Sequence, residues 1–292
     1  MKKSKVINNN TRGYFSYLLI SLLLIIAQPV TADSGATLMV TPSRVVFDER
    51  ARSAQVTLMN TGTEAGTFRV SFIRQNMTED GQFVAVKNNE KGMFSDPMIR
   101  FSPKQLVLPP GQSQVVRLML RKPKNLADGE YRSHMLLQTL PKPSQNTLAD
   151  SLKAKETETI KVEIIPVVGI SIPVIVRHGK LENSLTIDNA KLIPGSEANP
   201  RASISVDMHR KGNSSVYGDF RAIFTPNDGD EPTVIALANG VAVYTPNTLR
   251  HFSIPISAPV GTSFSDGTIR IIFLESGKDE DSGLIAETKL SL

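Results

Sequence analysis

Short apolar runs separated by turn residues recur along the chain, and helical periodicity is nearly absent after the first thirty-two residues. Residues 53–59 are the clearest case, because Val56 and Leu58 alternate with Gln55 and Thr57. Such alternation predicts a strand with one buried face. Gly, Asn, Asp and Pro residues close most of these runs, as turns require. The pattern is typical of β-sandwich proteins and predicts an all-β fold.

The strand-like runs fall into two series joined by a short polar connector at Arg177-His178-Gly179-Lys180. The first series covers residues 40–47, 53–59, 68–72, 115–120 and 131–140. The second covers residues 185–193, 202–208, 220–224, 233–237, 252–256, 268–274 and 284–290. Two domains of more than 100 residues each can bury sufficient cores. We therefore expect one β domain at 33–178 and another at 179–292.

The N-terminus has the three parts of a secretory signal peptide. Its basic residues are Lys2, Lys3, Lys5 and Arg12. An apolar run follows at residues 14–27, and Val30 and Ala32 occupy the small-residue places of a cleavage site. The run is shorter than the roughly 20 residues of a membrane-spanning helix. These features predict a signal peptide at 1–32, export to the periplasm, and no membrane insertion after cleavage.

Removal of residues 1–32 also removes most of the positive charge. The chain has 33 Lys and Arg against 28 Asp and Glu, and four of the basic residues lie in the signal peptide. The rest is nearly neutral, so the charge gives no reason to expect a nucleic-acid partner. The absence of cysteine means that apolar cores, not disulfides, must stabilise the exported domains.

Catalytic and metal-binding motifs are missing from the sequence. The four histidines have no metal-ligand spacing; they are His134, His178, His209 and His251. The acidic stretches at 228–231 and 279–281 lack the spacing of a calcium loop. No nucleophile elbow or phosphate-binding glycine loop is present. We therefore predict no enzymatic activity, no cofactor and no metal.

Residues 160–176 form the most unusual segment, because they are apolar over most of their length. The segment is longer than most strands. Pro166 and Pro173 lie inside it, and proline confines a strand to a sheet edge or a bulge. A long apolar edge is an aggregation hazard unless it is the working surface, and it also predicts that the free protein caps itself as a dimer. A polar loop at 141–159 precedes the segment.

Arg44 interrupts an otherwise apolar strand and can be interpreted in two ways. Strand alternation alone predicts a side chain that faces solvent. Alternatively, its guanidinium lies in a cleft and binds a carboxylate through two parallel hydrogen bonds.

Three motifs resemble the PapD-like periplasmic pilus chaperones. They are TPSRVVFD at residues 41–48, QLVLPPGQS at 105–113 with the following Val-Arg-Leu at 116–118, and EYRS at 130–133. The resemblance covers residues 38–178 and is weaker beyond, where Asp266-Gly267 before an apolar strand is the best match. It implies two immunoglobulin-like sandwiches arranged as a boomerang.

The resemblance also implies a function. In this family the last strand of the first domain fills the groove of a pilus subunit that lacks its own final strand. The subunit is then delivered to an outer-membrane usher. The expected partners are therefore pilus or fimbrial subunits and an usher.

The strand that would fill the subunit has two faces, and either could point toward the client. Val162, Ile164, Val168 and Ile170 share one parity, and we expect them to fill the subunit pockets. Alternatively, this face packs on the protein's own core, and Ile165, Val167 and Ile175 face the subunit. Bulges at the prolines would exchange the two faces.

Charged residues complete what the resemblance implies. Arg44 matches the arginine that holds the subunit's C-terminal carboxylate, but the family's second basic residue falls at Pro173. Either another base, such as Arg132, assists Arg44, or the anchoring is shifted. Glu130, Arg177 and Asp266 match an interdomain charge cluster that fixes the hinge angle.

Two other functions fit parts of the sequence. A secreted two-domain adhesion or structural β-sandwich protein without a client would share the signal peptide and the fold, but it would not need an apolar edge strand. A periplasmic hydrolase or carbohydrate-binding enzyme is disfavoured, because the chain has no tryptophan and no acid–base pair motif.

Overall fold

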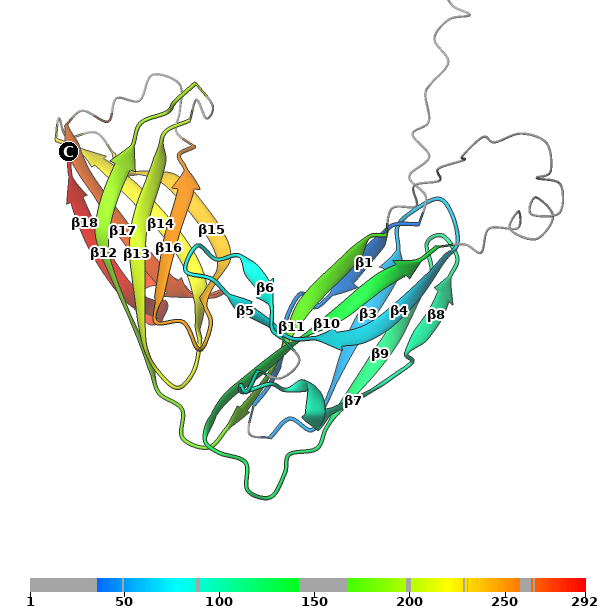
Figure 1. The fold of residues 1–292 in the computed structure, drawn as a ribbon. Helices are drawn as coiled ribbons and strands as arrows, with labels where there is room; N and C mark the ends of the chain where they lie inside the picture. The colour runs from blue at the N-terminus through cyan, green and yellow to red at the C-terminus, as the bar shows by residue number, and fades with distance from the viewer. Residues whose placement is uncertain are drawn as a thin grey trace, which may run out of the picture.

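The computed structural model describes residues 36–48, 50–87, 90–141, 167–197, 201–227, 229, 231–257, 264 and 266–292. Strands dominate these residues and form two sandwiches set at an angle to each other (Figure 1). The prediction of an all-β fold with two sandwich domains in a boomerang arrangement is therefore confirmed. The predicted signal peptide at 1–32 lies outside the described residues.

The N-terminal sandwich has two sheets, β1-β3-β9-β7 and β2-β11-β10-β4-β8. Its elements are β1 (Leu38–Thr41), β2 (Val45–Phe47), β3 (Ser53–Asn60), β4 (Gly66–Ile73), β5 (Gln75–Met77), β6 (Phe83–Ala85), η1 (Asp96–Met98), β7 (Ile99–Ser102), β8 (Gln105–Leu108), β9 (Ser113–Leu120), β10 (Gly129–Leu140) and β11 (Gly169–His178). The sheets pack together because alternate residues point inward. Val56 and Leu58 of β3, for example, are completely buried.

The first strand changes sheets at Pro42. β1 pairs with β3 in one sheet, whereas β2 runs parallel to β11 in the other. The sequence predicts a kink at this proline, and the kink carries the chain from one sheet to the other. Arg44 lies immediately after the crossover, where the chain enters the edge of the second sheet.

The C-terminal sandwich also has two sheets, β12-β13-β16 and β15-β14-β17-β18. Its elements are β12 (Asn183–Ile193), β13 (Ser203–Gly212), β14 (Val216–Pro226), β15 (Thr233–Val243), β16 (Leu249–Pro255), β17 (Gly267–Glu275), α3 (Glu280–Gly283) and β18 (Leu284–Ser291). Phe220, Phe224 and Phe273 are the largest buried side chains of a core separate from the N-terminal one.

A small apolar cluster joins the two sandwiches. Met77 and Ile175 of the N-terminal sandwich pack against Ala242 and Tyr244 of the C-terminal one. The β5–β6 hairpin reaches toward the C-terminal sandwich (Figure 1), and the His251 amide donates to the carbonyl of Glu79 in its turn, at 2.7 Å. Among the described residues, no helix has the length and apolar character needed to span a bilayer.

Candidate functional site

One edge of β11 is only partly covered by its own sheet. β11 pairs with β10 over its whole length, from Gly169 to His178. On the other side, β2 pairs only with Val174–Val176. Within the described part of the chain, residues 169–173 therefore have a strand neighbour on one side alone. Pro173 lies where this half-open stretch ends, as expected for a proline that cannot donate a ladder hydrogen bond.

The two faces of β11 have different surroundings. Ile172, Val174 and Val176 are buried in the N-terminal core, and Ile170 packs against the same core. Ile175 points the other way and lies in the cluster between the sandwiches. The expectation that Ile170 faces a client is therefore wrong, because the pleat of β11 turns even-numbered residues inward.

The remaining residues of the predicted pocket-filling set lie before β11. Val168 is 65% exposed, and its carbonyl accepts a hydrogen bond from the amide of Thr139 at 3.0 Å. Its neighbour Val167 is 49% exposed. Val162, Ile164 and Ile165 lie outside the described residues. The even-numbered residues of β11 lie on the N-terminal core, so the odd-numbered residues are the ones that point away from it. Ile175 is an odd-numbered residue that the C-terminal sandwich already covers.

Arg44 faces a cavity between the two sandwiches. Strand alternation holds around it, since Val45 and Phe47 are buried in the core. Its guanidinium stacks over the ring of Tyr217, with the Cζ atom 4.0 Å from the centroid. Arg44 Nε and Nη1 are buried without a hydrogen-bond partner. Buried donors normally find acceptors, so this guanidinium has unused capacity for an anion.

The cavity at Arg44 has a volume of about 550 Å³ and is built from both sandwiches. Val46 and Arg177 line it from the N-terminal side, and Ser215 and Glu275 line it from the C-terminal side. Arg177 is thus the second cationic residue at the cavity.

Arg132 does not share this cavity. It is 4% exposed, and its Nη2 donates to the carbonyl of Thr245 at 3.1 Å, while Nε and Nη1 have no partner. Burial lowers the pKa of Arg132 to about 10, and the charge of Arg44 acts in the same direction. Arg132 lines a separate cavity of about 240 Å³ with Phe94 and Pro246. Arg132 and Arg44 therefore line different cavities, which disfavours the alternative in which Arg132 assists Arg44.

Glu130 links the sandwiches through a buried set of hydrogen bonds. Its carboxylate is completely buried and lies 3.2 Å from Arg177 Nε. It also accepts a hydrogen bond from the Ser215 amide at 3.3 Å and another from the Ser215 hydroxyl. That hydroxyl in turn accepts from the Thr245 amide at 3.0 Å. The structure thus brings two of the three residues of the expected charge cluster together.

Asp266, the third expected member, lies elsewhere, so this part of the prediction is wrong. It precedes β17 and accepts a hydrogen bond from Asn227 Nδ2 at 2.6 Å. The opposite end of β17, at Glu275, borders the Arg44 cavity. Ser215 of the C-terminal sandwich donates to the Glu130 carboxylate instead, and nothing in the sequence around this serine distinguishes it from an ordinary turn residue.

Comparison with known proteins identifies the N-terminal sandwich. Residues 37–177 match the family described as "Pili and flagellar-assembly chaperone, PapD N-terminal domain". The N-terminal sandwich therefore belongs to the PapD-like chaperones. The match extends from β1 to Arg177 in β11 and so includes Arg44, Glu130 and the half-open edge.

Solved structures of low sequence identity resemble this chain. One is a chain of the CsuC-CsuE chaperone-tip adhesion subunit complex of Acinetobacter baumannii, with 14% identity, a TM-score of 0.42, and coverage of 87% of this chain and 97% of the other. The CupB2 chaperone of Pseudomonas aeruginosa has 11% identity, a TM-score of 0.40, and coverage of 87% and 100%. The E. coli chaperone DraB has 11% identity, a TM-score of 0.39, and coverage of 88% and 97%. No curated protein matches the sequence significantly.

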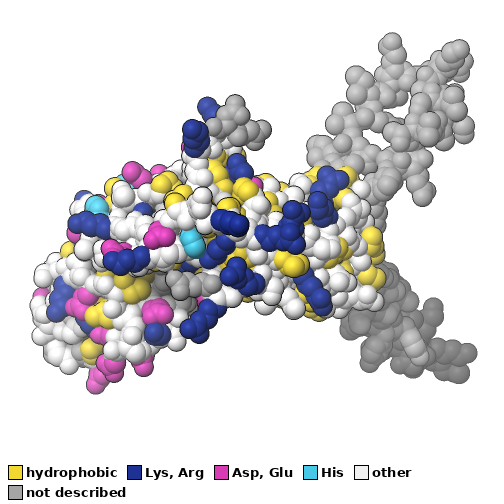
Figure 2. All heavy atoms as spheres, turned by 90° about the horizontal axis from the view of Figure 1, so that it is seen from below, with side chains coloured by type: hydrophobic (Ala, Val, Ile, Leu, Met, Phe, Trp, Pro, Cys, Tyr) yellow, Lys and Arg dark blue, Asp and Glu magenta, His cyan; other side chains and the backbone are white. Residues whose placement is uncertain are grey.

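Charge is unevenly distributed over the surface of the two sandwiches. In the view of Figure 2, Lys and Arg side chains predominate over the N-terminal sandwich on the right, and Asp and Glu side chains gather mainly over the C-terminal sandwich on the left. The basic surface belongs to the same sandwich as Arg44 and the half-open edge of β11, and it favours the approach of anionic groups.

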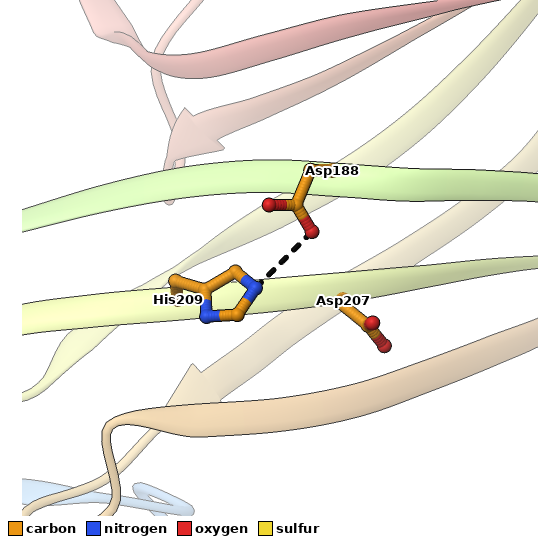
Figure 3. Close-up of side chains that lie close together, drawn as sticks. All are labelled: Asp188, Asp207 and His209. Carbon is orange, nitrogen blue, oxygen red and sulfur yellow. Dashed lines mark hydrogen bonds and ion pairs between the residues drawn. The ribbon is translucent and has the colours of Figure 1, made fainter.

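A second group of polar side chains lies on the C-terminal sandwich (Figure 3). Asp188 of β12 and Asp207 and His209 of β13 place their ligand atoms within 4.8 Å of one another. His209 Nε2 lies 3.1 Å from Asp188 Oδ1. Sequence spacing missed this group, because its residues come from two strands that meet only after folding.

Proposed function

We propose that this protein is a periplasmic chaperone that holds pilus or fimbrial subunits and delivers them to an outer-membrane usher. It would bind a subunit by adding the half-open edge of β11 to the subunit's incomplete sheet. The observation that carries the proposal is the one-sided pairing of residues 169–173. The family of the N-terminal sandwich supports the same role. The signal peptide predicted at 1–32 supports a periplasmic location.

Strand addition at this edge would combine main-chain and side-chain interactions. Each new main-chain hydrogen bond contributes about 0.5–1.5 kcal/mol. Exposed apolar residues next to the strand, such as Val167 and Val168, would each add about 1.5–3 kcal/mol when a subunit buries them. The sequence prediction extends this edge through Val162 and Ile164, which lie outside the described residues.

Arg44 is proposed as the anchor for the subunit's terminal carboxylate. Its unpaired Nε and Nη1 are suited to a two-pronged interaction. Arg177 lines the same cavity and adds positive charge, whereas Pro173 offers none. Anchoring by Arg44 with support from Arg177 is therefore the arrangement that we favour over one that uses Arg132.

Capture of a subunit by edge variants tests the proposal. The protein is co-expressed with a small exported subunit of the pilus type and is then purified. Val167→Asp, alone and with Ile165→Asp, should abolish co-purification, because a charge cannot enter an apolar pocket without a large cost. Circular dichroism checks that each variant folds.

Val107→Asp is the matched control. Val107 is 64% exposed on β8, the opposite edge of the same sheet. This variant should capture the subunit as the wild type does. The proposal fails if the folded Val167→Asp and Ile165→Asp double variant still captures subunits. Sedimentation of the free wild type and of the double variant tests whether the same edge caps itself in a dimer.

A further inference from the structure

The outer face of the three-stranded C-terminal sheet carries a set of metal-ligating side chains. Asp188 of β12 lies directly opposite Asp207 of β13 in the ladder, and His209 follows two residues later on the same face. Their ligand atoms all lie within 4.8 Å of one another. Figure 3 shows Asp188 and His209 directed toward each other, with Asp207 beside them on the same strand as His209.

The donor set is mixed and not merely acidic. Two carboxylate oxygens and one imidazole nitrogen suit zinc and similar transition-metal dications, whereas calcium and magnesium prefer oxygen ligands alone. Three protein ligands leave a fourth position for water. The side chains of Asp188, Asp207 and His209 are 62%, 21% and 40% exposed, so an ion can enter directly from solvent.

The surrounding residues hold Asp207 in place. His251 Nδ1 lies 2.7 Å from Asp207 Oδ1, across the ladder on β16. Asn189 Nδ2 donates to Asp207 Oδ2 at 2.9 Å. Outer partners of this kind orient metal-ligating carboxylates and tune metal affinity. A register shift after Asp188 interrupts the ladder, and such irregularities commonly redirect a side chain.

The electrostatics of the sheet also favour a cation here. Carboxylates placed directly opposite each other on neighbouring strands destabilise a sheet. A bound dication would neutralise both carboxylates at once, whereas His209 contacts only Asp188 and His251 contacts only Asp207.

We propose that Asp188, Asp207 and His209 form a binding site for a zinc-type dication on the C-terminal sandwich. His251 acts as a positioning residue that orients Asp207. The site lies on a different sandwich from Arg44 and β11, so metal binding does not depend on subunit capture.

Titration of the metal-free full-length protein with Zn²⁺ tests the site by calorimetry at pH 7.5. The wild type should bind one ion saturably. His209→Ala and Asp188→Asn should abolish this binding, and His251→Ala should weaken it by about 10–100-fold. His178→Ala, a change of the same kind on β11, is the matched control and should bind as the wild type does.

Two further measurements keep the result unambiguous. Circular dichroism confirms that each variant is folded, and Co²⁺ absorption reports whether a bound ion has tetrahedral geometry. Absence of saturable binding in the wild type would show that these residues form ion pairs only and would overturn the proposal. Equal Zn²⁺ affinity in folded His209→Ala would also overturn it.

Discussion

Two buried charged residues, two positions apart on β10, have opposite surroundings. Glu130 is 0% exposed, and its carboxylate meets Arg177, the Ser215 amide and the Ser215 hydroxyl. Arg132 is 4% exposed, yet two of its guanidinium nitrogens have no partner. Both side chains reach the C-terminal sandwich, since Arg132 also donates to Thr245. The same strand thus carries one charged group whose hydrogen bonds are saturated and one with donors that have no hydrogen-bond partner.

The difference separates a structural task from a binding task. A saturated buried charge fixes the two sandwiches relative to each other, because all its partners must stay in place. Unsaturated buried cations reduce stability, and proteins keep such violations mainly at functional sites. Arg44 shares this condition with Arg132. The interface therefore has a Glu130 region that holds the domains and an Arg44–Arg132 region that is unsaturated.

Loss of Glu130 should have the largest effect on stability. Glu130→Ala removes the acceptor for Arg177 and Ser215 and leaves both donors poorly satisfied. Breaking a buried charge pair costs about 3–5 kcal/mol. Urea unfolding followed by far-UV circular dichroism measures this loss, since the chain has no tryptophan for fluorescence.

Glu182→Ala is the control for that prediction. The carboxylate of Glu182 pairs with Lys180 at 2.7 Å but is 68% exposed. Exposed pairs contribute about 0–1 kcal/mol, so this variant should stay close to the wild type. Similar losses in the two variants would show that the burial of Glu130 has no special role.

Most of the fold follows from local sequence patterns. Residues 185–193 and 268–274 were predicted as strands and correspond to β12 (Asn183–Ile193) and β17 (Gly267–Glu275). Alternation and turn residues act over a few positions, and they are enough to place such strands. They do not fix which face of β11 is buried, because both faces are apolar and the period alone cannot distinguish them. The position of Ile170 illustrates this limit.

The site follows from sequence only where a motif carries it. Arg44 and Glu130 lie in stretches that resemble a family, so their places near the interface could be expected. Ser215 could not be found in this way, since it is 85 residues from Glu130 in the chain and has no distinctive neighbours. Asp266 was misplaced because the resemblance is weak in the C-terminal sandwich. Contacts across two domains depend on tertiary geometry that short patterns do not contain.

His134 extends the comparison to pH, with the next largest expected effect. It follows Arg132 by two positions on β10, and neither ring nitrogen has a partner. Burial lowers the pKa of His134 to about 4, and the charge of Arg132 adds to this. Between the two pKa values, His134 is therefore protonated in the unfolded chain and neutral in the folded chain. The contribution of neutral His134 to the free energy of unfolding is fully present above about pH 6.5. It falls by on the order of 3 kcal/mol as the pH drops to about 4.

Comparison with His134→Leu isolates this contribution. Urea unfolding is measured for both proteins at several values between pH 7.5 and pH 4.5, where most carboxylates remain ionised. The difference in unfolding free energy should shift in favour of the variant as the pH falls. A difference that stays constant with pH would show that His134 is protonated equally in both states.

Substitution of Arg44 should change stability least and so gives the sharpest test of the contrast. Arg44→Met removes two unpaired donors and keeps most of the side-chain volume, but it loses the stacking on Tyr217, which is worth about 0.5–2 kcal/mol. Replacement of a buried charge by an apolar residue is often neutral or stabilising. The net change in unfolding free energy should therefore stay within about 1 kcal/mol.

Subunit capture should nevertheless be lost, because the proposed carboxylate anchor is gone. A loss of stability as large as that of Glu130→Ala, with capture intact, would mean that Arg44 holds the domains together instead of holding a client.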